Sequence, residues 1–387
     1  MAAGKTVVVV ALGSAQTLSW AATYYLPAIL AEAIAADLAL SPSTVFAAFS
    51  AALLVIAALA PTAGRLIDRH GGRNLLLASN LLLAVGLTGL GLVGDFLGLL
   101  AAWILLGVGM AFGLYDAAFT TLSRLYGSAA RPAITGVTLV AGFASTVGWP
   151  VSAALLAEFG WRETCFAWAA TQLVLALPFN FCVPRAGPPL PPPVATGGPQ
   201  PSARSDRVAM WLLAAVFAML GFVATGMASH LPRLLEATGA SPTAAVAAGA
   251  LIGPAQVAAR LLEFGLLRRL HPLVCARLAT ALHPLGTLAF PLVGAAAAPA
   301  FALLHGGGNG LMTIAKGTLP LALFGPAGYG RRLGLISAPG SLAQAASPLI
   351  FGLLVDRYGA LSFALSAGLN VLAFSLLFAP AITRRRS

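Results

Sequence analysis

The sequence predicts an all-α integral membrane protein whose twelve transmembrane helices form two parallel repeats of six. Three observations support this fold class. Of the 387 residues, 59% are hydrophobic and only 9% are charged; the apolar residues gather in twelve long runs; and the basic residues concentrate in every second loop. About a quarter of the residues of a soluble protein are charged. The missing charge indicates that lipid surrounds most of the surface.

The twelve runs each approach or exceed the length of about 20 mostly apolar residues that one bilayer span needs. Six lie at roughly 6–31, 44–64, 74–94, 97–120, 133–157 and 163–183, and six more at roughly 208–230, 243–266, 278–297, 299–323, 334–355 and 360–381. The first run continues too far for a signal peptide and has no small-residue cleavage site. We therefore expect it to remain as the first transmembrane helix.

The basic residues predict the orientation, because cytoplasmic loops are enriched in Lys and Arg. With the N-terminus inside, 17 of the 22 Lys and Arg residues lie in cytoplasmic loops, three in outside loops and two within helices. Both termini are therefore predicted to be cytoplasmic. All but two of the basic residues are Arg, a bias that resembles a GC-rich bacterial genome, so we expect a multi-pass protein of the bacterial inner membrane.

The net charge of +11 would suggest nucleic-acid binding in a soluble domain. Here the charge lies in short loops between apolar runs, and topology accounts for it, so no nucleic-acid partner is expected. The three cysteines, Cys165, Cys182 and Cys275, have no metal-ligand spacing. The sequence contains no nucleotide-binding loop, and we expect neither a metal nor a cofactor.

A segment rich in Pro and Gly divides the chain into an N-terminal half (1–183), a cytoplasmic linker (184–207) and a C-terminal half (208–387). The halves resemble each other at an offset of 200 residues: Ser41-Pro42 precedes the second helix and Ser241-Pro242 the eighth. Chance matching in an alanine-rich chain is the alternative. Because six helices separate the copies, both run in the same direction, and a substrate site is expected at the midplane between the halves.

The loop after the second helix carries the most specific motif, Gly64-Arg65-Leu66-Ile67-Asp68-Arg69-His70-Gly71-Gly72-Arg73. It resembles the signature G-x-L-x-D-R-x-G-R-R of the major facilitator superfamily, with Gly72 where the family usually has a basic residue. The resemblance implies a secondary transporter that works as a monomer on a small molecule within the lipid bilayer. It also implies that Asp68 and Arg69 form a gating latch between the halves, within a motif completed by Gly64, Gly71 and Arg73.

Arg260 lies within the eighth predicted helix, one turn after Gln256. A charge at the bilayer centre costs at least about 2.5–3.5 kcal/mol on insertion scales, so such a residue is a functional candidate. A guanidinium matches a carboxylate in shape, and the segment 256–260 resembles that of monocarboxylate and oxalate transporters of the superfamily. Both residues are candidates for binding a small organic anion. A structural pair between Arg260 and Glu263 is the alternative.

The tenth predicted helix adds Lys316 and Asn309, the latter among four glycines that are expected to let helix backbones approach closely. Both are substrate-binding candidates. Snorkelling of Lys316 to the cytoplasmic face is the alternative. His305 of the same helix is interpreted as a packing residue near a helix end.

In the N-terminal half, the first helix offers Gln16, Trp20 and Tyr24 as substrate-binding candidates, although Tyr24 also suits an interfacial aromatic belt. Asp116 in the fourth helix is the candidate carrier of a coupling proton. Its alternative role is to pair with a basic residue near the inner face.

The sequence thus predicts a secondary transporter that works by alternating access, with a small organic anion as its cargo and with possible coupling to protons. Efflux of an amphipathic or toxic compound by proton antiport is the second interpretation. A membrane-embedded transferase is disfavoured, because the predicted spans lack the paired carboxylates or the His/Asp pair that such chemistry needs. We therefore do not expect an enzyme.

Overall fold

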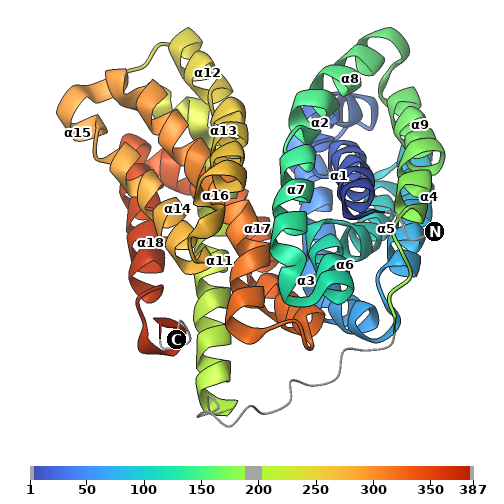
Figure 1. The fold of residues 1–387 in the computed structure, drawn as a ribbon. Helices are drawn as coiled ribbons and strands as arrows, with labels where there is room; N and C mark the ends of the chain where they lie inside the picture. The colour runs from blue at the N-terminus through green and yellow to red at the C-terminus, as the bar shows by residue number, and fades with distance from the viewer. Residues whose placement is uncertain (1–3, 188–202, 384–387) are drawn as a thin grey trace. The chain divides into compact units, whose positions relative to one another are not determined.

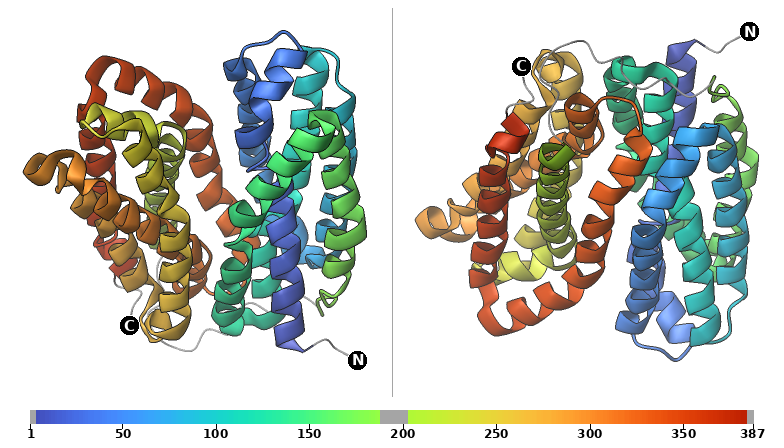
Figure 2. Two further views of the ribbon diagram at one scale, coloured as in Figure 1. Left: turned by 90° about the horizontal axis from the view of Figure 1, so that it is seen from above. Right: turned by 90° about the horizontal axis from the view of Figure 1, so that it is seen from below.

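The computed structural model describes residues 4–187 and 203–383, and all regular secondary structure within them is helical. The chain divides into two compact units, Met1–Pro192 with Pro326–Leu335, and Pro193–Gly325 with Ile336–Ser387. Figures 1 and 2 show each unit as a bundle of packed helices. The predicted linker lies mostly at 188–202, outside the described residues, as do Arg384, Arg385 and Arg386 of the predicted cytoplasmic C-terminus.

The first unit begins with a helix in two pieces, and a π-helical turn (Gln172–Ala176) interrupts its last span. Its helices are α1 (Lys5–Ala22), α2 (Pro27–Asp37), α3 (Pro42–His70), α4 (Arg73–Leu92), α5 (Phe96–Gly113), α6 (Tyr115–Tyr126), α7 (Arg131–Ala141), α8 (Ala144–Phe159), α9 (Trp161–Thr171) and α10 (Leu177–Phe181).

The second unit comprises α11 (Ala203–Ala237), α12 (Pro242–Ala250), α13 (Ile252–Gly265), α14 (Pro272–Thr287), α15 (Phe290–Val293), α16 (Ala298–Phe324), α18 (Ser362–Leu376) and α19 (Pro380–Thr383). Helix α17 (Tyr329–Tyr358) begins in the first unit and continues in the second.

Several predicted spans are broken. The first continues to Asp37 but is interrupted between Ala22 and Pro27, since a proline has no N–H to donate to the preceding turn. The fourth is interrupted at Leu114, which has extended backbone between α5 and α6. At that break the Gln16 side chain donates from Nε2 to the carbonyl of Gly113 over 2.6 Å. Buried side chains therefore replace helical hydrogen bonds where the helices break.

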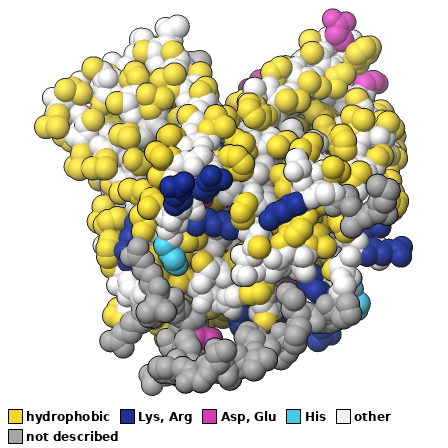
Figure 3. Space-filling view, in the orientation of Figure 1, with side chains coloured by type: hydrophobic (Ala, Val, Ile, Leu, Met, Phe, Trp, Pro, Cys, Tyr) yellow, Lys and Arg dark blue, Asp and Glu magenta, His cyan; other side chains and the backbone are white. Residues whose placement is uncertain are grey.

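Within the described residues, nine helical runs are long and apolar enough to cross a membrane. Three of them contain 64, 53 and 48 residues, more than one span needs, and the count of twelve stays a prediction. Large apolar side chains are exposed on the outside of both units, with Leu97 72% and Leu292 83% exposed. Figure 3 shows hydrophobic side chains spread over much of the visible surface. The prediction of an all-helical membrane protein is confirmed.

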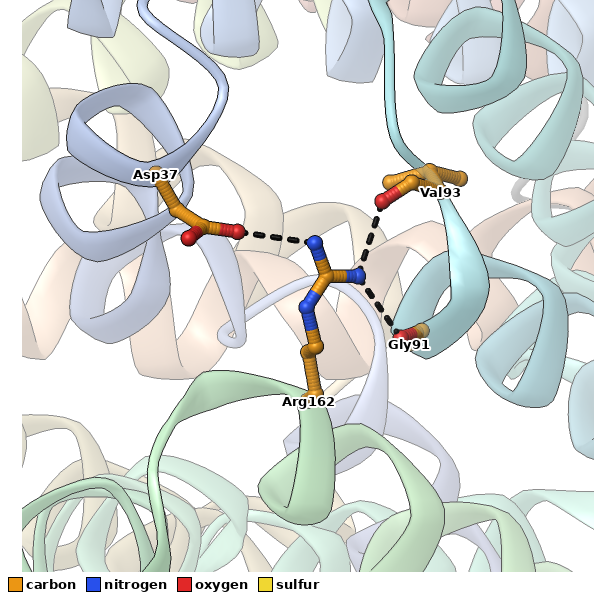
Figure 4. A network of polar contacts seen from close by, with 4 residues as sticks. All are labelled: Asp37, Gly91, Val93 and Arg162. Carbon is orange, nitrogen blue, oxygen red and sulfur yellow. Dashed lines mark hydrogen bonds and ion pairs between the residues drawn. The ribbon is translucent and has the colours of Figure 1, made fainter.

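The helix ends of the first unit are tied together by Arg162, at the start of α9. Its Nη1 donates to the carbonyls of Gly91 (3.0 Å) and Val93 (2.8 Å), and its Nη2 donates to Asp37 Oδ2 (2.8 Å) (Figure 4). One guanidinium thereby satisfies carbonyls at the end of α4 and pairs with the last residue of α2.

Candidate functional site

The carboxylate of Asp68, in the last turn of α3, lies at the start of α17. Its Oδ1 accepts from the backbone N–H of Gly330 (3.0 Å), and its Oδ2 accepts from that of Arg331 (2.9 Å). Both partners belong to the segment 326–335, which groups with the first unit. The N–H groups of a first helical turn have no partners within the helix, and an anion there also interacts favourably with the helix dipole. The motif carboxylate therefore caps α17.

Three positions of the motif require glycine, two because a side chain would collide with a neighbouring residue and one because of its backbone conformation. A Cβ on Gly64 would overlap the backbone carbonyl of Gly330, and a Cβ on Gly72 would overlap the Thr121 side chain. Gly71 ends α3 with φ +80°, a conformation that L side chains rarely adopt. The basic residue that the family usually has in place of Gly72 would not fit here without a shift of α6.

The basic residues of the motif lie away from the carboxylate. Arg69 is exposed, and the Arg73 guanidinium lies 5.4 Å from the ring centre of Phe181. Instead, Arg124 of α6 donates from Nε to the backbone carbonyl of Asp68 over 3.2 Å. The sequence predicted that Asp68 faces helix termini and arginines, but it did not identify α17 or Arg124 as the partners.

Arg260 is the most deeply buried arginine side chain among the candidates, at 5% exposed on α13. Its Nη2 donates to Thr313 Oγ1 of α16 over 3.5 Å, and its Nε and Nη1 have no hydrogen-bond partner among the described residues. Gln256 lies one turn earlier on α13 and is half-buried. The side chain therefore holds unsatisfied donors in a buried place, which costs free energy unless a ligand accepts them.

Helix α16 approaches its neighbours through its glycines, which confirms the predicted close packing. Cβ atoms on Gly306 and Gly310 would lie 2.7 Å and 2.5 Å from the carbonyl oxygens of Ile252 and Gln256 on α13. A Cβ on Gly308 would lie 2.7 Å from the Ala279 carbonyl oxygen on α14. The glycines thus determine how near α13 and α14 come to α16.

This packing brings Arg260 and Asn309 into one polar chain. Thr313, which accepts from Arg260, donates to the backbone carbonyl of Asn309 over 2.8 Å. The Asn309 side chain donates from Nδ2 to Nε2 of His305 over 3.1 Å. Lys316, one turn after Thr313, is half-buried and engaged in interactions of its own.

The interpretation of His305 as a packing residue near a helix end was wrong. Its side chain is 3% exposed, and its Nδ1 lies 2.8 Å from Nδ1 of His283 on α14, which is also 3% exposed. His283 was not among the residues that the sequence suggested. The one available signal was a second polar, ionisable residue within a predicted span.

In the first unit, the candidates of the first predicted span fall into two groups, with Gln16 and Trp20 on α1 and Tyr24 in the break between α1 and α2. Gln16 is fully buried and used at the α5–α6 break, with its Oε1 lacking a hydrogen-bond partner among the described residues. Trp20 and Tyr24 belong to an aromatic cluster, with the Trp20 ring centre 5.0 Å from that of Tyr24 and 4.8 Å from that of Tyr115. Asp116 follows Tyr115 in the first turn of α6.

Comparisons with known proteins agree with this architecture. The sequence profile of the Major Facilitator Superfamily matches residues 12–315. No curated protein sequence matches the chain significantly. The structure is similar to that of the human organic anion transporter MFSD10 (TETRAN), with a TM-score of 0.69 and 18% identity over 96% of this chain and 98% of that one. It is also similar to the proton:xylose symporter XylE bound to 6-bromo-6-deoxy-D-glucose, with a TM-score of 0.71 and 16% identity over 96% of this chain and 94% of that one.

At these identities the solved structures establish similarity of fold alone. The profile, in contrast, covers well over half of the residues. Together with the twelve predicted spans and the motif at the end of α3, it identifies this chain as a member of the Major Facilitator Superfamily.

Proposed function

We propose that this protein transports a small organic anion across the bacterial inner membrane by alternating access, with a proton as the coupling ion. Membership of the superfamily makes the chain a multi-pass transporter of a small molecule rather than an enzyme. The cargo class rests on one observation, the buried Arg260 guanidinium with two unsatisfied nitrogens.

A carboxylate suits this guanidinium better than a neutral solute does. Two parallel N–H donors match the two oxygens of a carboxylate, and such charge-assisted bonds are roughly twice as strong as neutral ones. Gln256 and Asn309 are proposed to contribute amide donors, and Lys316 a second positive charge. Of the similar structures, one is described as an organic anion transporter and one as a proton symporter, and both descriptions support the proposal.

For gating, we retain the motif at the end of α3 as a latch on α17. Asp68 would hold the start of α17 in one state and release it in the other, with Gly64 permitting the close approach of α17 and Gly71 ending α3. The exposed Arg69 and the ring-stacked Arg73 are proposed to fix the loop at the cytoplasmic surface.

A thermal-shift screen of the purified protein tests the cargo class. We expect lactate, oxalate and succinate to stabilise the wild type, by about 2.7 kcal/mol at one hundred times Kd. Arg260→Ala should abolish the shift. Arg268→Ala, which removes an exposed arginine of the same unit, should retain it. Equal shifts in the wild type and in Arg260→Ala would contradict an arginine-centred site.

Efflux of an amphipathic compound is the second candidate function, and the aromatic cluster of the first unit favours it. Trp20 has a buried Nε1 without a hydrogen-bond partner among the described residues, and its ring lies against Tyr24 and Tyr115. Aromatic faces of this kind attract cationic ligands. Stabilisation by hydrophobic cations, unchanged in Arg260→Ala and lost in Trp20→Ala, would favour this function instead.

A further inference from the structure

In the second unit, a continuous chain of hydrogen bonds connects side chains of α16, α14 and α18. Figure 1 labels these three helices, of which α14 packs against both others. Asn309 Nδ2 lies 3.1 Å from His305 Nε2, and His305 Nδ1 lies 2.8 Å from His283 Nδ1. His283 Nε2 in turn lies 2.9 Å from Ser366 Oγ, which donates to the Phe363 carbonyl over 2.9 Å. The two imidazoles therefore share one hydrogen bond and are each held at the opposite nitrogen.

These partners determine where each ring carries its proton. The single hydroxyl hydrogen of Ser366 is used on the Phe363 carbonyl, so Ser366 accepts from His283 Nε2–H. A neutral His283 then accepts at Nδ1, and His305 must donate from its own Nδ1. His305 Nε2 is left as an acceptor, and the Asn309 amide donates to it. Two neutral imidazoles thus satisfy every contact of the chain.

The same arrangement has room for one additional proton. A proton that binds His305 Nε2 makes that ring cationic, and the Asn309 amide must turn its oxygen toward the new N–H. The Nδ1 proton of His305 can then move 2.8 Å to His283 Nδ1, so that the charge is shared between the rings. A second proton would place N–H groups on both Nδ1 atoms, which face each other. The pair is therefore a one-proton site.

A small cavity lies beside the pair. Its volume is about 20 Å³, enough for one water molecule. The polar side chains in its wall are His283, His305, Asn309 and Asn370, and the remaining lining is Leu220, Val223, Ala279, Gly308 and Met312. A single water bound there would have the polar partners it needs and could deliver a proton to the imidazoles.

Among the residues that the structure describes, no charged side chain lines this cavity. Of the helices packed around the pair, α12 and α18 have no titratable residue. The other packed helices carry, besides the pair itself, the following described titratable groups: Arg260 and Glu263 (α13), Arg277 and Cys275 (α14), Lys316 (α16), and Asp206, Arg207, His230, Arg233 and Glu236 (α11). Arg277 donates to the Leu377 carbonyl, and Arg233 pairs with Asp356. The imidazoles are thus the titratable groups nearest the cavity.

We infer that the buried imidazole pair His283–His305 is the binding site of the coupling proton. Burial disfavours an isolated positive charge here, so the protonated state requires compensation. The chain from His305 through Asn309 and Thr313 ends at Arg260, where the proposed function places the anion. An anion at Arg260 supplies negative charge at the other end of this chain and so favours the protonated pair. By linkage the proton must then strengthen anion binding by the same factor. Anion and proton are then carried together.

The proton site is tested without any substrate by ¹⁵N NMR of histidine-labelled protein in detergent. Of the five histidines, two should change together on acidification and take up one proton in total. In His305→Gln, the His283 ring should stay neutral across that range. His230→Gln, a histidine of α11 that contacts the Pro348 carbonyl, should leave the paired response intact. Two independent protonations, or none, would overturn the inference.

Transport in proteoliposomes tests the coupling. Uptake of labelled lactate or oxalate is measured with and without an inward proton gradient, and counterflow is measured at equal pH. The ratio of uptake with the gradient to uptake without it should exceed one in wild type and in His230→Gln, and fall to one in His283→Gln and His305→Gln. Ratios equal to wild type in both pair variants would refute the site. Absence of wild-type counterflow with every anion would instead refute the anion function, while the NMR result still decides the proton site.

Discussion

Buried polar side chains connect the helices of both units, but with different chemistry. In the first unit, Asn80 of α4 donates to Gln172 Oε1 over 2.9 Å, Ser19 of α1 donates to the same oxygen over 3.2 Å, and Asn180 donates to Asn80 Oδ1 over 2.7 Å. All four side chains are buried. Amides and aliphatic hydroxyls are neutral and do not titrate at physiological pH. This network can therefore stabilise the unit but cannot bind a coupling proton.

The network of the second unit contains two imidazoles, His283 and His305, in place of amides alone. His283 lies on α14, the third span of its predicted half, as Asn80 lies on the third span of the other. Each reaches the last span of its half, His283 through Ser366 and Asn80 through Gln172. Both units therefore connect these spans through buried hydrogen bonds, and of the two networks only the one with imidazoles contains groups that can take up a proton.

The largest expected effect comes from the glycine packing that assembles the second network. In Gly310→Ala the new Cβ would lie 2.5 Å from the Gln256 carbonyl oxygen, so α13 and α16 must separate. We expect a loss of about 1–3 kcal/mol of stability, and loss of the anion-induced thermal shift.

Gly307→Ala is the matched control on the same helix, because its Cβ would meet only Leu282 Cδ1 at 3.6 Å. It should keep wild-type stability or gain up to about 1 kcal/mol from helix propensity. Equal destabilisation by the two substitutions would show that the close approach of α13 to α16 is not the cause of the stability loss in Gly310→Ala.

The first network should contribute stability without pH dependence. In Gln172→Leu, the Asn80 and Ser19 side chains lose their shared acceptor. Interhelical hydrogen bonds of this kind are worth about 1–2 kcal/mol at most, and we expect a loss of that size in thermal unfolding. The loss should be the same at pH 6 and pH 8; a loss that changes with pH would mean that an ionisable group takes part.

The units also differ in the loop after their second span, where Asp68 of the first unit is replaced by Arg268 in the second. In Asp68→Asn, one oxygen becomes an NH₂ group that cannot accept from the Gly330 or Arg331 N–H. We expect a loss of about 0.3–1 kcal/mol and faster amide hydrogen exchange at 330–331. Arg69→Gln, which alters an exposed residue of the same motif, serves as the control; unchanged exchange in Asp68→Asn would exclude the cap.

The smallest effect is expected from Asp116, which the sequence suggested as the proton carrier. Asp116→Asn should leave the two-ring histidine response in the ¹⁵N spectrum as it is in wild type, because Asp116 belongs to the first unit and the histidine chain to the second. A lost response would move the proton site to Asp116 or to a group coupled to it.

The sequence by itself determined the helical membrane fold. Apolar runs can satisfy their backbone in lipid only as helices, and the glycines around Asn309 were enough to predict the close packing of α16. The sequence also singled out Arg260, because an arginine within an apolar run is rare and costly. These features follow from local composition, which a linear chain displays directly.

Tertiary structure decided which polar groups meet. His283 and His305 are 22 residues apart, and nothing in either helix shows that their Nδ1 atoms face each other. The same holds for Gln16 and the Gly113 carbonyl, and for Asp68 and the start of α17, which are separated by 97 and more than 260 residues. The physical reason is that hydrophobic periodicity fixes where helices lie, whereas the pairing of buried polar groups depends on the rotation and depth at which helices pack.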